Sequence, residues 1–198
     1  ANVTLSVETQ GGHSSVPPQQ TAVGILAAAV ARLEDNPMQA RLEGPVQEMF
    51  RWLAPEMSLG PRIVIGNLWL FGPLVSAQLA SVPETNATIR TTAAATMLSA
   101  SDAPNVLARR ASAVINYRVL PGDTLEDVLG HVHRVVDDAR VRVELGPGEA
   151  NGPTAVSPVD ADAFDHIAAS VRAVFPEAFV APSLVIPATD ARHYGALT

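Results

Sequence analysis

Alternating apolar and polar positions predict four strands in the first 148 residues. Residues 2–8 place Val3, Leu5 and Val7 on one face, which is typical of a half-buried strand. The same period of two predicts strands over 111–119 and 140–146, and a threonine-rich run predicts another over 87–98.

Helical spacing separates these strands. Residues 20–35 carry one apolar stripe that ends at Asn36-Pro37, and the stripe consists of Val23, Leu26, Ala27, Val30 and Leu33. Residues 125–139 form a second amphipathic pattern, which we expect to begin with a capping box of Thr124 and Asp127.

The order is strand, helix, insertion, strand, strand, helix, strand. Without an insertion at about 38–84, this is the β-α-β-β-α-β pattern of a ferredoxin-like α+β sandwich, an antiparallel sheet with helices on one face. A short helix is expected at 44–57 inside the insertion. We therefore predict a first domain over 1–148.

A Gly/Pro-rich break near residue 150 precedes a second, partial α/β segment, 149–198. We expect a helix near 160–174 and a strand-like segment over 178–188.

Composition narrows the function classes. The 198 residues carry a net charge of −7 and no basic stripe, which argues against a nucleic-acid partner. There is no cysteine, so disulfides and thiolate zinc sites are excluded. The most apolar stretch, 62–80, is interrupted by Gly66, Asn67, Gly72 and Pro73, so we predict no membrane-spanning segment in this chain.

The histidines are candidate metal ligands and candidate catalytic groups. His131 and His133 are two apart on a predicted helix, and His193 near Asp190 lacks a third ligand, so no metal site is predicted. His13 differs, because Gly11-Gly12 permits a close backbone approach at a strand end. An imidazole there could stabilise an oxyanion, and the alternative is a turn histidine bonded to local backbone.

Three motifs taken together resemble a known family. The segments "GGHSSVPPQQTAVGILAAAVARLE", "APNVLARRASAVINYRVLPGDT" and "ATDARHY" are similar to those of zinc-dependent aminoacylases and carboxypeptidases. The 38–84 insertion points to the carboxypeptidase S and N-acyl-amino-acid hydrolase branch. In that family a catalytic domain with two zinc ions is interrupted by a ferredoxin-like lid that commonly mediates homodimerisation.

The resemblance implies roles for individual residues. His13 would polarise the scissile carbonyl, often in the partner's active site, and Asn105 and Arg118 would hold the carboxylate end of a peptide or N-acyl amino acid. Thr189 and Asp190 would line the substrate. The family's metal ligands lie in segments outside this chain, so we expect no zinc site here and an inactive fragment. The alternative is a non-catalytic dimerisation or ligand-binding module of the same fold.

Overall fold

The computed structural model describes residues 1–146, 152–186 and 194. Contacts divide the chain into two compact units. Unit 1 comprises residues 1–39 and 90–153, and unit 2 comprises residues 40–89 and 154–198.

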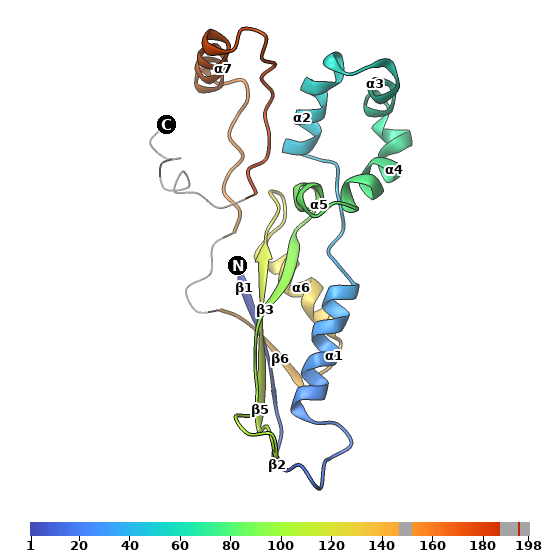
Figure 1. The fold of residues 1–198 in the computed structure, drawn as a ribbon, viewed down its shortest axis with the longest axis vertical. Helices are drawn as coiled ribbons and strands as arrows, with labels where there is room; N and C mark the ends of the chain where they lie inside the picture. Colours follow the sequence, from blue (N-terminus) through green and yellow to red (C-terminus); the bar gives the residue numbers. More distant parts are fainter. Residues whose placement is uncertain (147–151, 187–193, 195–198) are drawn as a thin grey trace. The chain divides into compact units, whose positions relative to one another are not determined.

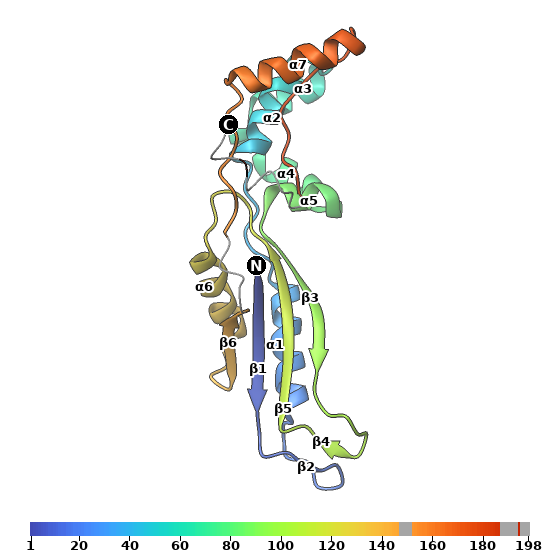
Figure 2. The ribbon, with the colours of Figure 1, turned by 90° about the vertical axis from the view of Figure 1, so that its left-hand side faces the viewer.

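Unit 1 contains a four-stranded antiparallel sheet. Its strands are β1 (Asn2–Glu8), β3 (Thr92–Ser99), β5 (Arg110–Arg118) and β6 (Val141–Leu145), in the order β3-β5-β1-β6. Helices α1 (Ala22–Asp35) and α6 (Leu125–Val136) cover one face of this sheet (Figures 1 and 2). This arrangement confirms the predicted α+β sandwich and its ferredoxin-like order.

The core of unit 1 lies between that face and the two helices. Alternate residues of β1 and β5 point into it, since successive strand residues face opposite sides of a sheet. The fully buried side chains include Val3, Leu5, Val7, Ile115, Tyr117, Val128, Val132 and Val136.

Helix α1 buries only part of the predicted stripe, since Leu26 and Leu33 are buried but the rest is not. Val23 is 47% exposed, whereas Ile25 and Ala29 are buried against the sheet. In this alanine-rich sequence several faces are similarly apolar, and contact with the sheet selects the one that carries Ile25.

The ends of α6 follow local sequence signals. Thr124 and Asp127 form the predicted capping box, with backbone N–H groups donating to each other's side chains over 2.8 and 3.1 Å. At the other end Asp137 adopts a left-handed conformation with φ of 39°.

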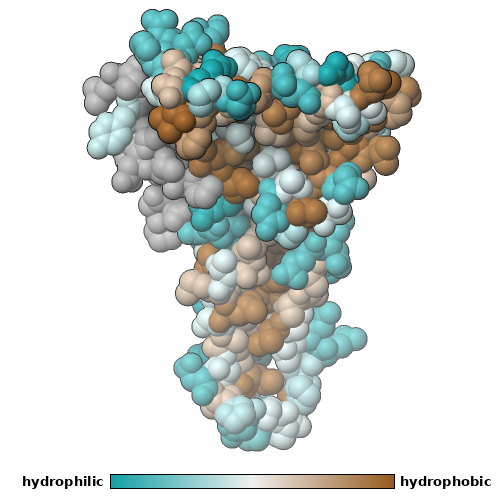
Figure 3. Space-filling view, turned by 45° about the horizontal axis from the view of Figure 1, so that its top comes forward, coloured by the Kyte–Doolittle hydropathy of each residue, from teal (hydrophilic) through white to brown (hydrophobic). Residues whose placement is uncertain are grey.

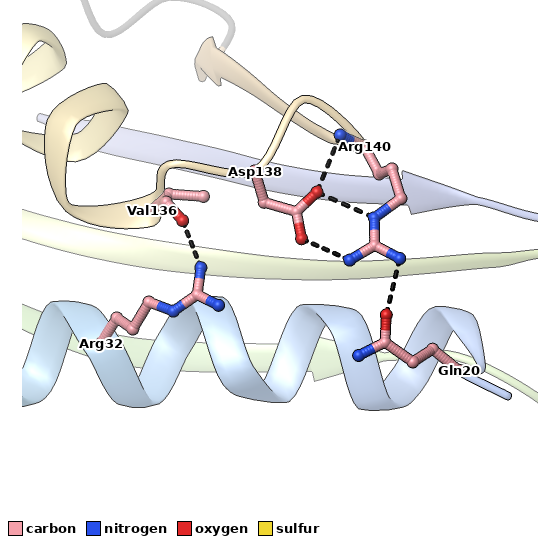
Figure 4. Close-up of polar contacts among 5 residues, drawn as sticks. All are labelled: Gln20, Arg32, Val136, Asp138 and Arg140. Atoms are coloured by element: carbon pink, nitrogen blue, oxygen red, sulfur yellow. Dashed lines mark hydrogen bonds and ion pairs between the residues drawn. The ribbon is translucent and has the colours of Figure 1, made fainter.

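Arginines fasten α1 to the turn between α6 and β6 (Figure 4). Arg32 donates to the Val136 carbonyl at the end of α6. Arg140 donates to both Asp138 oxygens over 2.9 and 2.6 Å and to Gln20 Oε1 over 2.6 Å. The hydrogen bonds from Arg140 hold the pKa of the Asp138 carboxyl well below its ordinary value.

Unit 2 is helical in its described part. Its elements are α2 (Pro45–Leu53), η1 (Ala54–Glu56), α3 (Leu59–Gly66), α4 (Leu68–Ala80), α5 (Pro83–Ile89) and α7 (Asp162–Val174). Val46, Phe50 and Ile89 form its buried cluster. Trp52 meets Phe164 of α7 edge to face, with ring centroids 5.3 Å apart.

Two strand predictions were wrong in part. The run 87–98 begins as the end of α5, because Ile89 is buried in the unit 2 cluster and Thr88 bonds back to the Thr85 carbonyl over 2.7 Å. Over the described residues 178–186 there is no strand. Pro182 lacks an N–H there, which weakens any pairing.

In the described part, no single helix is long and apolar enough to cross a membrane. Helices α3 and α4 reach that length and composition only as a pair, and the pair is bent by 110°.

Candidate functional site

A two-stranded ribbon extends the sheet of unit 1 at one end and carries His13. Its strands are β2 (Gly12–His13) and β4 (Val106–Leu107), with Gly12 opposite Leu107 and His13 opposite Val106. The ribbon continues the β1–β5 ladder through the bond from Thr9 N to Arg109 O, 2.8 Å. The ribbon therefore forms the tip of the sheet (Figure 2), and His13, the last residue of β2, is exposed.

Gly11 allows the chain to enter this ribbon. It has φ of +67°, a conformation that L-residues with a Cβ rarely adopt. A Cβ at this position would lie 2.5 Å from Arg109 Cγ and 3.0 Å from Leu107 O. The close approach expected from the Gly11-Gly12 pair is therefore present.

Local hydrogen bonds orient the His13 ring. The Ser15 backbone N–H donates to Nδ1 over 3.2 Å, and Ser15 Oγ lies 2.8 Å from the same atom. Because a backbone N–H can only donate, Nδ1 accepts, and the neutral ring carries its proton on Nε2. A local hydrogen bond and a role in stabilising an oxyanion are thus compatible, because the contact with Ser15 leaves the Nε2–H donor on the other side of the ring.

Asn105 lies next to the end of the ribbon that carries His13. The Ser14 N–H donates to the Asn105 carbonyl over 3.0 Å, which joins the residue that follows β2 to the residue that precedes β4. Asn105 is exposed, and its side chain makes no hydrogen bond with the described residues. A neutral donor ring and an amide are therefore presented together at the tip.

Arg118 lies at the opposite end of β5, where it pairs with Thr92. The strand Arg110–Arg118 separates it from the ribbon by roughly 27 Å at the rise of an antiparallel strand. Arg118 is exposed and has no ion pair with the described residues. His13 and Asn105 are brought together, whereas Arg118 is not brought to them.

A buried polar network, which was not predicted, fixes the turn after Arg118. The Leu120 N–H donates to Thr91 Oγ1 over 2.8 Å, and Thr91 Oγ1–H donates to Asp123 Oδ2. Thr91 and Asp123 are both buried. The "TT" and "PGDT" segments contain these two residues, but they are 32 residues apart, and no local sequence pattern predicts that they pair.

Two predicted substrate residues, Thr189 and Asp190, lie outside the described residues. Within residues 1–146, 152–186 and 194, no three His, Asp or Glu side chains converge on a position that could hold a metal ion. The described side chains therefore do not form a zinc site.

The model of the M20 peptidase dimerisation domain matches residues 1–144. The chain belongs to this family. That finding confirms the resemblance to aminoacylase-type and carboxypeptidase-type metallopeptidases.

Curated relatives match the whole chain. It is 39% identical over 197 residues to "Probable carboxypeptidase S-like 2" of Dictyostelium discoideum, covering 100% of this chain and 38% of the relative. It is 40% identical over 201 residues to "N-fatty-acyl-amino acid synthase/hydrolase PM20D1" of Homo sapiens, covering 100% and 40%. The chain thus spans about two fifths of the length of these relatives.

Solved structures show the same fold. A metallo-carboxypeptidase of the M20 family from Sulfolobus solfataricus superposes with a TM-score of 0.57 at 16% identity, covering 99% of this chain and 54% of that one. Human carnosine dipeptidase 1 superposes with a TM-score of 0.54 at 13% identity, covering 94% of this chain and 44% of that one.

Proposed function

We propose that this chain supplies the lid of a zinc-dependent hydrolase acting on N-acyl amino acids or peptide C-termini. The observation that carries the proposal is His13, exposed at the tip of the sheet with Nδ1 occupied by Ser15 and Nε2–H available. Family membership and the names of the relatives support the reaction class. By the resemblance two zinc ions, bound outside the described residues, would supply Lewis-acid chemistry.

In this proposal, His13 donates a hydrogen bond from Nε2 to the oxygen of the scissile carbonyl. The bond strengthens as negative charge develops on that oxygen, so it lowers the barrier more than it strengthens substrate binding. One such donor is worth about 3 kcal/mol, or 10²–10³ in kcat. Asn105 adds an amide beside it.

Arg118 would bind the substrate carboxylate through two parallel hydrogen bonds. In an N-acyl amino acid one α-carbon separates the scissile amide from the carboxylate, and one residue spans at most about 3.6 Å. His13 and Arg118 of one unit 1 lie too far apart to contact one such molecule. We therefore propose that His13 and Asn105 of one copy act on a substrate held by Arg118 of a second copy in a homodimer.

The test is hydrolysis of N-acyl amino acids and short peptides by the zinc-loaded, intact gene product. His13→Ala should lower kcat 10²–10³-fold with metal content unchanged. His133→Ala is the matched control, since His133 is an exposed helix residue of the same unit. Equal rates for His13→Ala and wild type would reject the role of His13.

A non-catalytic dimerisation module is the second candidate. The edge strand β3 favours it, because Met97 and Leu98 are 66% and 69% exposed there. A stable dimer whose intact protein binds no metal and hydrolyses none of these substrates would favour this module.

A further inference from the structure

Helices α3 and α4 of unit 2 expose an unusual amount of apolar surface. Five large side chains on them are more than half exposed: Leu59, Ile63, Trp69, Leu70 and Leu74. Figure 3 shows hydrophobic side chains gathered in the upper right, where Figure 1 places these two helices. A contiguous apolar surface of this kind usually marks a binding site.

Charge is nearly absent from this surface. Residues 58–81 contain one charged side chain, Arg62. Its guanidinium donates to the carbonyls of Ala54, Pro55 and Met57, so it closes the preceding turn. The surface thus offers a ligand apolar contacts and little electrostatic attraction.

The bend between the helices forms a groove. Asn67 ends α3 and begins α4, and its side chain donates to the Ile63 carbonyl over 2.8 Å. One wall comes from residues on both sides of this bend and the other from α2 and its end. The lining consists of Ile65, Gly66, Leu68 and Trp69 facing Gln47, Phe50, Arg51 and Ala54.

The size and lining of the groove suit an aliphatic chain. Its volume is about 430 Å³, within the range of small-molecule sites. The lining contains no carboxylate, and its one cation, Arg51, is already paired with Glu48 over 3.1 Å. The tail of an anionic amphiphile therefore meets no carboxylate among the lining residues.

We propose that this groove binds the acyl chain of an N-acyl amino acid. The identity of the ligand rests on the proposed function, whereas the position of its binding site rests on the groove. A finite groove walled on two sides favours a single chain over a bilayer surface. We therefore expect binding to depend on the length of the acyl chain and not on the presence of a lipid surface.

The chain offers a matched pair of substitutions. Gly66 lines the groove, and a Cβ built there meets no atom within 4 Å, so Gly66→Phe can enter the open space. Gly72 of α4 is equally open but does not line the groove, so Gly72→Phe is the control.

The first measurement uses the intact protein with acetyl, hexanoyl and dodecanoyl glycine. For wild type and Gly72→Phe, KM should fall by up to about fourfold per methylene that reaches the groove. For Gly66→Phe the KM values of the hexanoyl and dodecanoyl substrates should converge. An unchanged dependence on chain length in Gly66→Phe would overturn the proposal.

A second measurement does not need hydrolysis. In a Trp52→Phe background, the emission of Trp69 is the part that a further Trp69→Phe substitution removes. Dodecanoate should shift this emission to the blue, because Trp69 is 82% exposed before binding. Gly66→Phe should abolish this shift and Gly72→Phe should retain it. If no substrate is hydrolysed but the shift follows this pattern, the proposed function fails and the groove stands.

Two outcomes overturn the groove: dodecanoate gives no shift, or Trp69 already emits as a buried residue in the ligand-free intact protein. In the first case, a shift with phosphatidylcholine vesicles would indicate a membrane contact. The second case would indicate that another part of the protein covers the groove.

Discussion

Replacing Gly11 by alanine tests whether the backbone at this corner places His13. The left-handed φ of +67° costs an alanine about 1–2 kcal/mol. The new Cβ would also lie 2.5 Å from Arg109 Cγ, which is close to the backbone and cannot swing away cheaply. Relieving such overlap costs about 1–3 kcal/mol, so we expect a total near 3 kcal/mol.

The assay is urea unfolding of this chain, with kcat of the intact protein measured in parallel. Gly11→Ala should lower the free energy of unfolding and also lower kcat, because Gly12 and His13 follow it in the ribbon. Gly24→Ala is the control: its Cβ would lie 3.5 Å from Thr21 Oγ1, an ordinary contact in α1, and should stabilise by about 0.5–1 kcal/mol. If Gly11→Ala matched wild type in both stability and kcat, the account of this corner would be refuted.

Three further predictions concern buried or partly buried groups. The Tyr117 hydroxyl is buried with no partner among the described residues, and burial raises its pKa to about 12. Tyr117→Phe should therefore raise the free energy of unfolding by about 1 kcal/mol and remove a stability contribution that wild type loses as pH rises from 10 through 12; a loss of stability would contradict this. Thr91→Val should cost about 2–3 kcal/mol because it removes a donor to Asp123, while Thr91→Ser should recover most of it in the same unfolding assay; equal losses would show that the hydroxyl is unimportant. Burial lowers the pKa of His131, whose Nε2 lies 2.9 Å from the Asn36 carbonyl. The contribution of neutral His131 to the free energy of unfolding should be complete above pH 6.5 and should decline as pH falls through the lowered pKa. His131→Gln should therefore flatten the dependence of stability on pH in that range.

The fold was predictable where its causes are local. Alternation in β1 and the Thr124–Asp127 capping box need only neighbouring residues, and both were predicted correctly. The stripe of α1 was predicted in part, with Leu26 and Leu33 right and Val23 wrong, because alanines make several faces similar and the sheet rather than the helix decides which is buried. Helix α4 has no apolar period to read, since apolar residues lie all round it.

The candidate site was predictable in identity but not in arrangement. Glycines and motif indicated His13, and Asn105 followed from the resemblance. Their neighbourhood depends on pairing between segments about 92 residues apart, and the proton position on His13 depends on Ser15, which no pattern marks. The separation of Arg118 from both emerged only from the register of β5.

In the proposed function, His13 of one copy acts on a substrate held by Arg118 of another copy. The most direct test mixes two inactive variants of the intact protein, His13→Ala and Arg118→Ala, under conditions where subunits exchange. If the two residues act across the dimer, half of the dimers are mixed and each has one intact site, so about a quarter of wild-type activity should return. If mixing restores no activity while exchange is verified, both residues serve the same copy and the claim is wrong.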